Sequence, residues 1–245
     1  AIYAGSYGWA SAGRFHNSKA QLSRFLNLTG GFTRSVNTYS LAAAEVVLPH
    51  VVGNMVKLQM AHHPWPAVAE HTELFVSFGG VPLKNAQVDS GGVAQHSAAE
   101  GLRACAKAGV EFINIGPVRG DAAAFLKAEW IQPRPSTDVA LMLGLAHTLV
   151  SENLHNPDFM AKYCVGFDRF LPYLMGEADG QAKDADWAAA IVDLEAGQIR
   201  ALARRMAAKR TLINVAWSLQ RTEHGEQPFW MVITLAAILG QIGLP

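Results

Sequence analysis

Three short runs of branched and aromatic residues alternate with longer helical patterns, and this alternation constrains the fold more than any other feature. The runs cover residues 74–78, 110–115 and 211–217. Between the first two, residues 98–108 have a helical pattern that Gly109 ends in a left-handed conformation. Strands that alternate with helices are typical of a parallel sheet with crossover helices. The sequence therefore predicts an α/β fold with an open, mostly parallel sheet.

Local signals predict further helices and one loop. A Ser-Thr-Asp sequence at 136–138 offers a capping side chain to a helix that is apolar nearly all round and hence buried. An Asn-Pro-Asp sequence at 156–158 opens another helix, with proline in its first turn. Residues 199–209 are amphipathic, and residues 229–240 form a core helix well short of the ~20 residues of a membrane span. The polar residues 176–186 predict a surface loop.

Composition excludes several classes of partner and site. The chain has 20 basic and 20 acidic residues, so no excess charge attracts nucleic acid or an anionic membrane. Cys105 and Cys164 lie far apart without a C-x-x-C spacing, which argues against a structural zinc site or an iron–sulfur cluster. Both are expected to be buried thiols. We therefore expect no nucleic-acid partner and no membrane span.

The two ends of the sequence have no targeting pattern. Residues 1–5 have neither a basic flank nor a cleavage site, and they look like a strand entered midway. The chain stops abruptly after residues 242–245. Both ends lead us to expect a piece of a longer protein, whose compartment, bacterial cytoplasm or periplasm, this sequence does not identify.

Each predicted strand is followed by a loop that contains one cation: Lys84, Arg119 and Arg221. In an open parallel sheet, ligands bind beyond the carboxyl ends of the strands. Three cations in one crevice would suit the pyrophosphate of a dinucleotide. Alternatively, each of them is an ordinary solvated loop charge.

Familiar nucleotide and hydrolase motifs are absent. No G-x-G-x-x-G follows any strand, and the sequence contains no G-x-x-x-x-G-K-[ST], H-E-x-x-H or G-x-S-x-G. A conventional nicotinamide-dependent oxidoreductase is thus a weak alternative. Less common cofactors remain as candidates for the ligand of this site.

Two further segments are candidates for a metal site. In the sequence GSYGW at 5–9, glycines on both sides of Tyr7 would let Tyr7 and Trp9 face a cavity, although packing in a turn is the alternative. Ser40 precedes an alanine-rich helical run, where an N-cap is the ordinary role. A deprotonated serine at a helix start is also a possible oxygen ligand for a high-valent metal, helped by the helix dipole.

Taken together, these segments resemble the dimethyl sulfoxide, trimethylamine N-oxide and biotin sulfoxide reductase family of bis-molybdopterin guanine dinucleotide enzymes. The resemblance runs through the whole chain. Its most specific pieces are GSYGW at 5–9, YS at 39–40 before AAA at 42–44, PRPSTDVALMLG at 133–144, and GEQ at 225–227 leading to GQIG at 240–243. One departure is AHHP at 61–64, where the family usually has a Gln-Gln-Thr-type stretch before its Trp-Pro pair.

The resemblance implies a role for each candidate residue. Ser40 would bind molybdenum through its side-chain oxygen, Trp9 would line the metal pocket, and Tyr7 would hydrogen-bond the metal's oxo group or the substrate oxygen. Asp138 would bind a guanine edge. The residues implied to contact the cofactor are Trp9, Lys84, Pro117, Arg119, Asp138, Ser218, Arg221 and Gln227.

The resemblance also implies a domain organisation and a reaction. The chain would be the central portion of a larger multi-domain enzyme, with residues 1–66 lining the metal site and residues 67–245 forming the α/β dinucleotide-binding domain. Its reaction would be oxygen-atom transfer from a small S-oxide or N-oxide, such as dimethyl sulfoxide, biotin sulfoxide, methionine sulfoxide or trimethylamine N-oxide. Tyr7 favours S-oxides, and the electron donor is not identifiable.

One rival interpretation comes from another class of protein. An isolated α/β nucleotide-binding or scaffold domain without catalytic activity would show the same alternation of strands and helices. Even under the enzyme interpretation, the activity is expected in the longer protein and not in these 245 residues alone.

Overall fold

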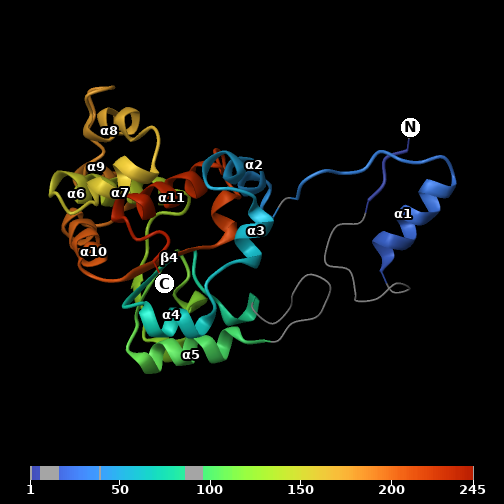
Figure 1. The fold of residues 1–245 in the computed structure, drawn as a ribbon, viewed down its shortest axis with the longest axis horizontal. Helices are drawn as coiled ribbons and strands as arrows, with labels where there is room; N and C mark the ends of the chain where they lie inside the picture. Colours follow the sequence, from blue (N-terminus) through green and yellow to red (C-terminus); the bar gives the residue numbers. More distant parts are fainter. Residues whose placement is uncertain (1, 6–16, 39, 86–95, 245) are drawn as a thin grey trace.

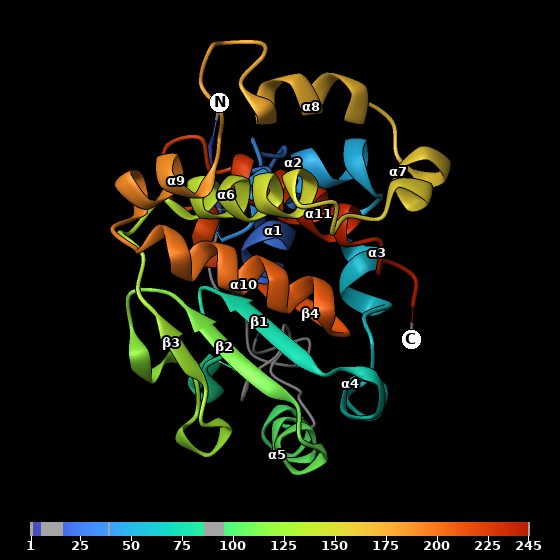
Figure 2. The same ribbon diagram turned by 90° about the vertical axis from the view of Figure 1, so that its left-hand side faces the viewer.

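Four parallel strands form one sheet in the computed structural model, which describes residues 2–5, 17–38, 40–85 and 96–244. The strands are β1 (Leu74–Phe78), β2 (Glu111–Ile115), β3 (Glu129–Ile131) and β4 (Thr211–Val215). Their order across the sheet is β3-β2-β1-β4, and every neighbouring pair is parallel. The strands β3, β2 and β1 lie side by side in Figure 2. The predicted open parallel sheet is confirmed.

The strands differ from the prediction in one missing strand and two boundaries. The strand β3 was not predicted, because three residues are too few to display a period-two pattern. The strand β2 starts after Val110, whose N–H donates to the Cys105 carbonyl at the end of the preceding helix. The strand β4 stops at Val215, because Trp217 begins a short 3-10 helix, Trp217–Gln220.

Helices cover both faces of the sheet (Figure 2). On one face lie α4 (Trp65–His71) and α5 (Ala98–Ala108), and on the other lie α6 (Asp138–Ser151), α10 (Ala196–Ala208) and α11 (Gln227–Leu239). The helix α5 ends as predicted at Gly109, which has a φ of 90°. Because successive strand side chains point to opposite faces, Val76 packs on the α6 side and Phe75 packs on the α5 side.

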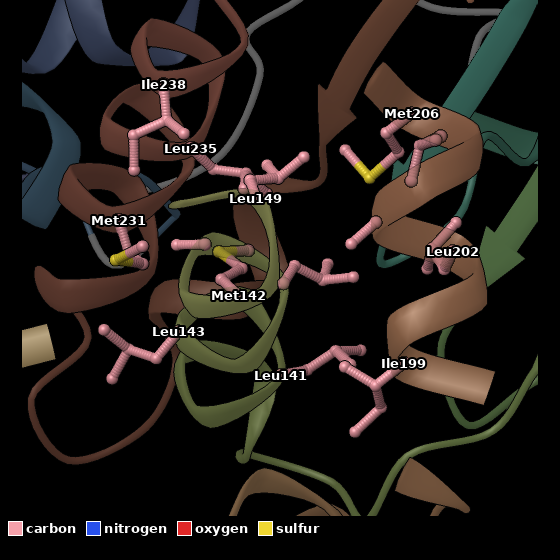
Figure 3. Packing of buried hydrophobic residues seen from close by; sticks show 14 of the residues in the cluster. Leu141, Met142, Leu143, Leu149, Ile199, Leu202, Met206, Met231, Leu235 and Ile238 are labelled. Carbon is pink, nitrogen blue, oxygen red and sulfur yellow. The ribbon is translucent and has the colours of Figure 1, made fainter. Parts of the chain in front are cut away.

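The helix α6 is the centre of the larger core. Leu141, Met142, Leu145 and Leu149 are fully buried, as the all-round apolar pattern predicted. Figure 3 shows α6 between α10 and α11, with Leu141 directed toward Ile199 of α10. The predicted core helix near residues 229–240 is also confirmed, since α11 buries most of its side chains.

The start of α6 corrects one prediction. Thr137 is the N-cap residue, but its side chain accepts no hydrogen bond from the helix. Its hydroxyl instead donates to the Arg134 carbonyl at 2.6 Å. The predicted side-chain cap is therefore wrong, whereas the predicted helix is right. In contrast, α7 (Pro157–Tyr163) begins as predicted, with Asn156 Oδ1 accepting the Phe159 N–H at 2.9 Å.

The segment between α8 (Phe167–Met175) and α9 (Ala185–Val192) is not a simple surface loop. Most of it is exposed, but Lys183 has only 3% of its surface accessible. Its ammonium group lies 2.7 Å from Asp179 and 4.2 Å from the centre of the Tyr173 ring. This ion pair over an aromatic ring anchors a segment that polarity alone predicted to be solvated.

The described N-terminal residues form a separate small unit. The helix α1 (Ser18–Leu28) lies apart from the sheet in Figure 1, and a parallel bridge joins Tyr3 to Thr33 on either side of it in the sequence. This bridge is all that the described residues show of the strand expected at 1–5. Phe25 and Leu28 of α1 are 62% and 79% exposed.

The next two helices pack against the sheet domain. The helices α2 (Ala42–Val51) and α3 (Met55–Met60) meet α11, where Ala44, Leu48 and Met55 enclose Phe229. Across the described ranges, no helix has the length and apolarity needed to cross a bilayer.

Candidate functional site

A row of polar side chains crosses the sheet one residue before three of its strands end. In the strand register, Ser77 of β1 is level with Asn114 of β2 and with Asn214 of β4. Asn214 donates to Ser77 Oγ at 2.9 Å and to the Gly80 carbonyl at 3.4 Å. Asn114 donates to the carbonyls of Val118 at 3.3 Å and Arg119 at 3.4 Å. This polar row fastens the loops beyond β1 and β2 to the sheet.

The polar row was missed by the sequence analysis. Its signal is a polar residue at the fourth position of three strands whose second, third and fifth residues are all apolar, LFVSF, EFINI and TLINV. Asn114 is 2% exposed, and its Oδ1 accepts no hydrogen bond from any residue that the structure describes. A buried acceptor without a partner is the kind of group that a ligand or water donor satisfies.

The segments that follow the four strands make up what we call the carboxyl edge, residues 79–85, 116–121, 132–138 and 216–221. Three of these segments are in contact. A Cβ built on Gly79 would lie 2.7 Å from Ala216 Cβ, and one on Gly80 would lie 2.7 Å from Asp121 Cβ. The Val81 N–H also donates to the Asp121 carbonyl at 2.8 Å. Glycine at 79 and 80 therefore lets the loops after β1, β2 and β4 approach one another.

The strand order places a topological switch point at this edge. From β1 the chain adds β2 and then β3 on one side, and it returns through α6–α10 to add β4 on the other side of β1. In such sheets, ligands bind outside the carboxyl ends of the strands where the order reverses. The loops after β1 and β4 are therefore the expected walls of a ligand site.

Ser40 is tied to the loop after β4 by the side chain of Gln220. Gln220 Nε2 donates to the Ser40 carbonyl, and Gln220 Oε1 accepts the Ala43 N–H at 2.8 Å and the Ala44 N–H at 3.4 Å. Gln220 itself is 8% exposed. The half-buried Ser40 thus lies beside the carboxyl edge, although it belongs to a distant part of the sequence.

The capping alternative for Ser40 is wrong. The helix α2 begins at Ala42, and its N-cap residue is Leu41. The N–H groups in its first turn are accepted by the side-chain oxygen of Gln220 and not by Ser40. The preceding turn is held by Thr38, whose hydroxyl accepts the N–H groups of Ser40 at 3.2 Å and Leu41 at 3.3 Å.

The three predicted cations reach the carboxyl edge in different states. Lys84 forms an ion pair with Asp121 at 2.9 Å, so its charge is partly neutralised. Arg119 and Arg221 are exposed, and neither pairs with an acidic residue within the described ranges. Two guanidinium groups are therefore available to an anionic ligand.

The remaining predicted contacts also lie at or near this edge. Pro117 and Ser218 are exposed in the segments after β2 and β4, and Gln227 is exposed at the start of α11. Asp138 begins α6 after β3, and burial raises the pKa of its carboxyl group. No hydrogen bond joins Asp138 to the other candidate residues in the part of the chain that the structure describes.

Tyr7 and Trp9 lie outside the described residues. Elsewhere, no three His, Cys, Asp or Glu side chains gather in a described metal-binding arrangement. Cys105 is fully buried, as predicted, and burial raises the pKa of its thiol, whereas Cys164 is only partly buried.

Two surface hollows lie at the opposite edge of the sheet. One of about 260 Å³ is bordered by His63, Arg210 and Thr211, and another of about 390 Å³ is bordered by Glu111, Glu129 and Arg205. Both are at the amino ends of strands, and neither contains a candidate residue. We place the site at the carboxyl edge, because the strand order reverses there and because the glycine contacts, free guanidinium groups and unpartnered Asn114 Oδ1 are all found there.

Comparisons with known proteins agree with this architecture. Acetylene hydratase from Pelobacter acetylenicus superposes with a TM-score of 0.64 at 22% sequence identity, covering 91% of this chain and 28% of that protein. At this identity the similarity concerns the fold alone.

Sequence relatives are closer. The chain is 47% identical over 244 residues to a dimethyl sulfoxide/trimethylamine N-oxide reductase of Rhodobacter capsulatus, covering 100% of the chain and 29% of that relative. It is 45% identical over 245 residues to a biotin sulfoxide reductase of Cereibacter sphaeroides, covering 100% of the chain and 33% of that relative. The chain thus spans about a third or less of the length of these relatives.

One family model matches the chain from its first residue to its last. The model describes molybdopterin oxidoreductases, and the match covers residues 1–245. Together with the relatives and with a parallel sheet whose strand order reverses beside Ser40, this match shows that the chain belongs to the molybdopterin oxidoreductase family.

Proposed function

We propose that this chain is the central part of a molybdenum-dependent reductase that removes an oxygen atom from a small S-oxide or N-oxide. Relatives that match all of the chain carry the names of dimethyl sulfoxide, trimethylamine N-oxide and biotin sulfoxide reductases. The structural observation that carries the proposal is the hydrogen-bonded junction between Ser40 and the loop after β4. It joins a candidate metal ligand to a candidate dinucleotide edge.

The groups at the carboxyl edge fit a bis-molybdopterin guanine dinucleotide chemically. Arg119 and Arg221 supply guanidinium groups that suit a pyrophosphate. Asp138 supplies a carboxylate that accepts from guanine donors, and the buried Asn114 Oδ1 has acceptor capacity that no described residue uses. The proposed contacts are completed by Lys84, Pro117, Ser218 and Gln227. Lys84 would contact the cofactor while it remains paired with Asp121.

Molybdenum, when bound, supplies the two-electron oxygen-atom transfer. The residues of this chain would hold the cofactor and orient the substrate. We assign the side-chain oxygen of Ser40 as a metal ligand at the positive end of the α2 dipole, where negative charge on that oxygen is favoured. We assign Trp9 to the wall of the metal pocket and to cofactor contact, and Tyr7 as the phenol that donates a hydrogen bond to the substrate oxygen.

The same proposal divides the chain and selects substrates. Residues 1–66 would line the metal, and residues 67–245 would hold the dinucleotide. Because the presence of Tyr7 resembles the S-oxide-reducing members of the family more than those restricted to N-oxides, we propose S-oxides as preferred substrates. The electron donor would be a partner protein or a reductant, which these residues do not identify.

Molybdenum content and reductase activity test the proposal in the full-length protein. The protein would be purified from a host that makes the cofactor, and molybdenum would be measured by mass spectrometry of the metal. Reduction of dimethyl sulfoxide, biotin sulfoxide and trimethylamine N-oxide would be followed with a reduced viologen dye. We expect about one molybdenum per chain and faster turnover of the S-oxides. A protein with no molybdenum and no turnover would instead be the catalytically inactive α/β domain.

Ser40→Ala tests the metal ligand. We expect the variant to change the absorption and electron paramagnetic resonance spectra of the metal, because an oxygen ligand is lost. Ser151→Ala is the control, since it removes a hydroxyl at the carboxyl end of α6, which is not among the proposed contacts, and should leave the metal spectrum unchanged. An unaltered spectrum with normal turnover in Ser40→Ala would show that Ser40 does not bind the metal.

A further inference from the structure

The side chain of Gln220 links two parts of the chain that are 180 residues apart. Its amide nitrogen donates to the Ser40 carbonyl, and its amide oxygen accepts the Ala43 and Ala44 N–H groups. It thus uses both ends of one buried amide on the turn that carries Ser40 and on the first turn of α2. A glutamine is the residue type that satisfies this arrangement, because one end must donate and the other must accept.

The backbone of Gln220 is held as firmly as its side chain. A Cβ built on Gly225 would lie 1.9 Å from the Gln220 carbonyl oxygen, so the chain after Gln220 folds back tightly against it. The neighbouring Arg221 N–H donates to the Ser218 carbonyl at 3.0 Å. Gln220 is therefore a fixed part of the loop after β4 and not a side chain that reaches out from a mobile surface.

We propose that Gln220 is a positioning residue, which sets the place of Ser40 relative to the loop that carries Ser218 and Arg221. This inference rests on the proposed function, because it makes Gln220 couple the metal ligand to the dinucleotide contacts. Gln220 itself touches neither metal nor substrate. Its amide keeps the Ser40 turn and the β4 loop at one separation, so a ligand held by both meets a preorganised pair of walls.

Two variants of Gln220 separate its two roles. Gln220→Met keeps the length of the side chain and removes its donor and its acceptor, and with them all three hydrogen bonds. Gln220→Glu keeps the acceptor for the Ala43 and Ala44 N–H groups, where a negative charge at a helix start is favoured, but it has no donor for the Ser40 carbonyl. A change in the metal spectrum or in kcat that both variants show therefore results from the loss of the hydrogen bond to the Ser40 carbonyl.

Gln241 provides a matched control. It also bridges two backbone groups, since its Oε1 accepts the Thr211 N–H at 2.8 Å and its Nε2 donates to the Lys209 carbonyl at 2.9 Å. These groups lie at the amino end of β4, at the opposite edge of the sheet from Ser40. Gln241→Met removes the same two kinds of bond without touching the proposed site.

The first measurement is amide hydrogen exchange on the full-length protein prepared without cofactor. Gln220→Met should speed exchange in the peptide that contains Ala43 and Ala44 by about 10-fold or more, because the N–H groups lose their acceptor. Gln241→Met should leave that peptide unchanged and speed exchange at Thr211. Unchanged exchange at residues 40–44 in Gln220→Met would overturn the proposal whatever the metal content of the longer protein.

The second measurement uses the full-length protein with its cofactor. For Gln220→Met and Gln220→Glu we expect molybdenum to be retained, the metal spectrum to shift, and kcat for dimethyl sulfoxide to fall by about 10- to 100-fold with a smaller change in KM. Gln241→Met should leave the spectrum and kcat as in the parent.

The outcomes distinguish this inference from the proposed function. If Ser40→Ala shifts the metal spectrum and the Gln220 variants do not, the enzyme assignment stands and the positioning role is wrong. If the unsubstituted protein contains no molybdenum, the proposed function and the metal role of Gln220 both fail. If the Gln220 and Gln241 variants alter the spectrum equally, the effect is general destabilisation and the positioning role is overturned.

Discussion

At the scale of single residues, glycine is required at position 79 for two separate reasons. Gly79 has a φ of +85°, and a Cβ there would lie 2.6 Å from Leu219 Cδ1 and 2.7 Å from Ala216 Cβ. The left-handed backbone costs an L-residue roughly 1–2 kcal/mol, and overpacking adds about 1–3 kcal/mol. We expect Gly79→Ala to lower the free energy of unfolding by about 2–5 kcal/mol in urea denaturation.

Gly109→Ala is the matched comparison for that prediction. Gly109 has a similar φ of +90°, but nothing lies within 4 Å of the position of its Cβ. Only the cost of the left-handed backbone applies, so we expect Gly109→Ala to lower the free energy of unfolding by roughly 1–2 kcal/mol. Equal losses in the two variants would show that the loops after β1 and β4 are not in close contact.

Asp138 is predicted to reduce the stability of the chain at neutral pH. Burial raises the pKa of this carboxyl above its usual value of 3.8, so the folded chain holds the proton more tightly than the unfolded chain. Stability is therefore lost as the pH rises from 3.8 through the raised pKa. We expect Asp138→Asn to raise the melting temperature by about 2 °C at pH 7 and to have no effect at pH 3.

The same substitution should weaken cofactor binding. A carboxylate offers two acceptors to a guanine edge, whereas the amide offers one acceptor and a competing donor. In the full-length protein we expect Asp138→Asn to lose guanine dinucleotide during dialysis faster than the parent. A variant that gained stability and retained the cofactor equally well would remove Asp138 from the proposed contacts.

At the scale of elements, α6 carries the larger core. Leu141 is fully buried, and truncating such a side chain usually costs about 2–5 kcal/mol. We expect Leu141→Ala to lower the free energy of unfolding by that amount. Leu28→Ala is the control, because Leu28 is a helical leucine that is 79% exposed and should change stability by less than about 0.5 kcal/mol.

An ion cluster joins the amino ends of β2 and β3 to α10. Glu111 pairs with Lys209 and Arg205, and Arg205 also pairs with Glu129. Hydrogen bonds from Lys209 and Arg205 lower the pKa of Glu111 below its usual 4.5. The stability from this carboxylate is thus present above pH 4.5 and is lost as the pH falls through the lowered pKa.

Glu111→Gln should remove only a modest part of the stability. The side chain is 43% exposed, so solvent screens the pairs, and we expect a loss of roughly 0.5 kcal/mol at pH 7. The loss should shrink in 1 M salt and vanish in strong acid. Glu70→Gln is the control, because the Glu70 side chain is 73% exposed beside His71 and its loss should change the free energy of unfolding by less than about 0.5 kcal/mol. A loss that persisted in acid would assign the effect to packing.

The elements that the sequence predicted are those with repeated local signals. The strands β1, β2 and β4 are runs of branched residues, and α6 and α11 are apolar on all sides. The strand β3 has three residues and depends on its neighbour β2 for its pairing, so no periodicity reveals it. The cap of α6 was also unpredictable, because the Thr137 hydroxyl finds a carbonyl upstream instead of the helix.

At the scale of the whole molecule, the carboxyl edge could be predicted, but its connection to Ser40 could not. Loops after parallel strands share one edge, so Lys84, Arg119 and Arg221 were predicted to lie together from their positions after strands. Gln220 looks like any loop glutamine in the sequence. Its partners are 180 residues away, and no pattern within a short window encodes such a contact.

The strand order also has a consequence for the sequence of events in folding. Ser77 of β1 pairs with Asn114 of β2, which is 37 residues later in the sequence, whereas Asn214 of β4 reaches Ser77 across 137 residues. Closing that long loop is entropically costly, and contacts between distant residues form slowly. We therefore expect β4 to join the sheet last. The carboxyl edge would then be completed last, so a dinucleotide that reached the proposed site during synthesis would meet only one of its walls.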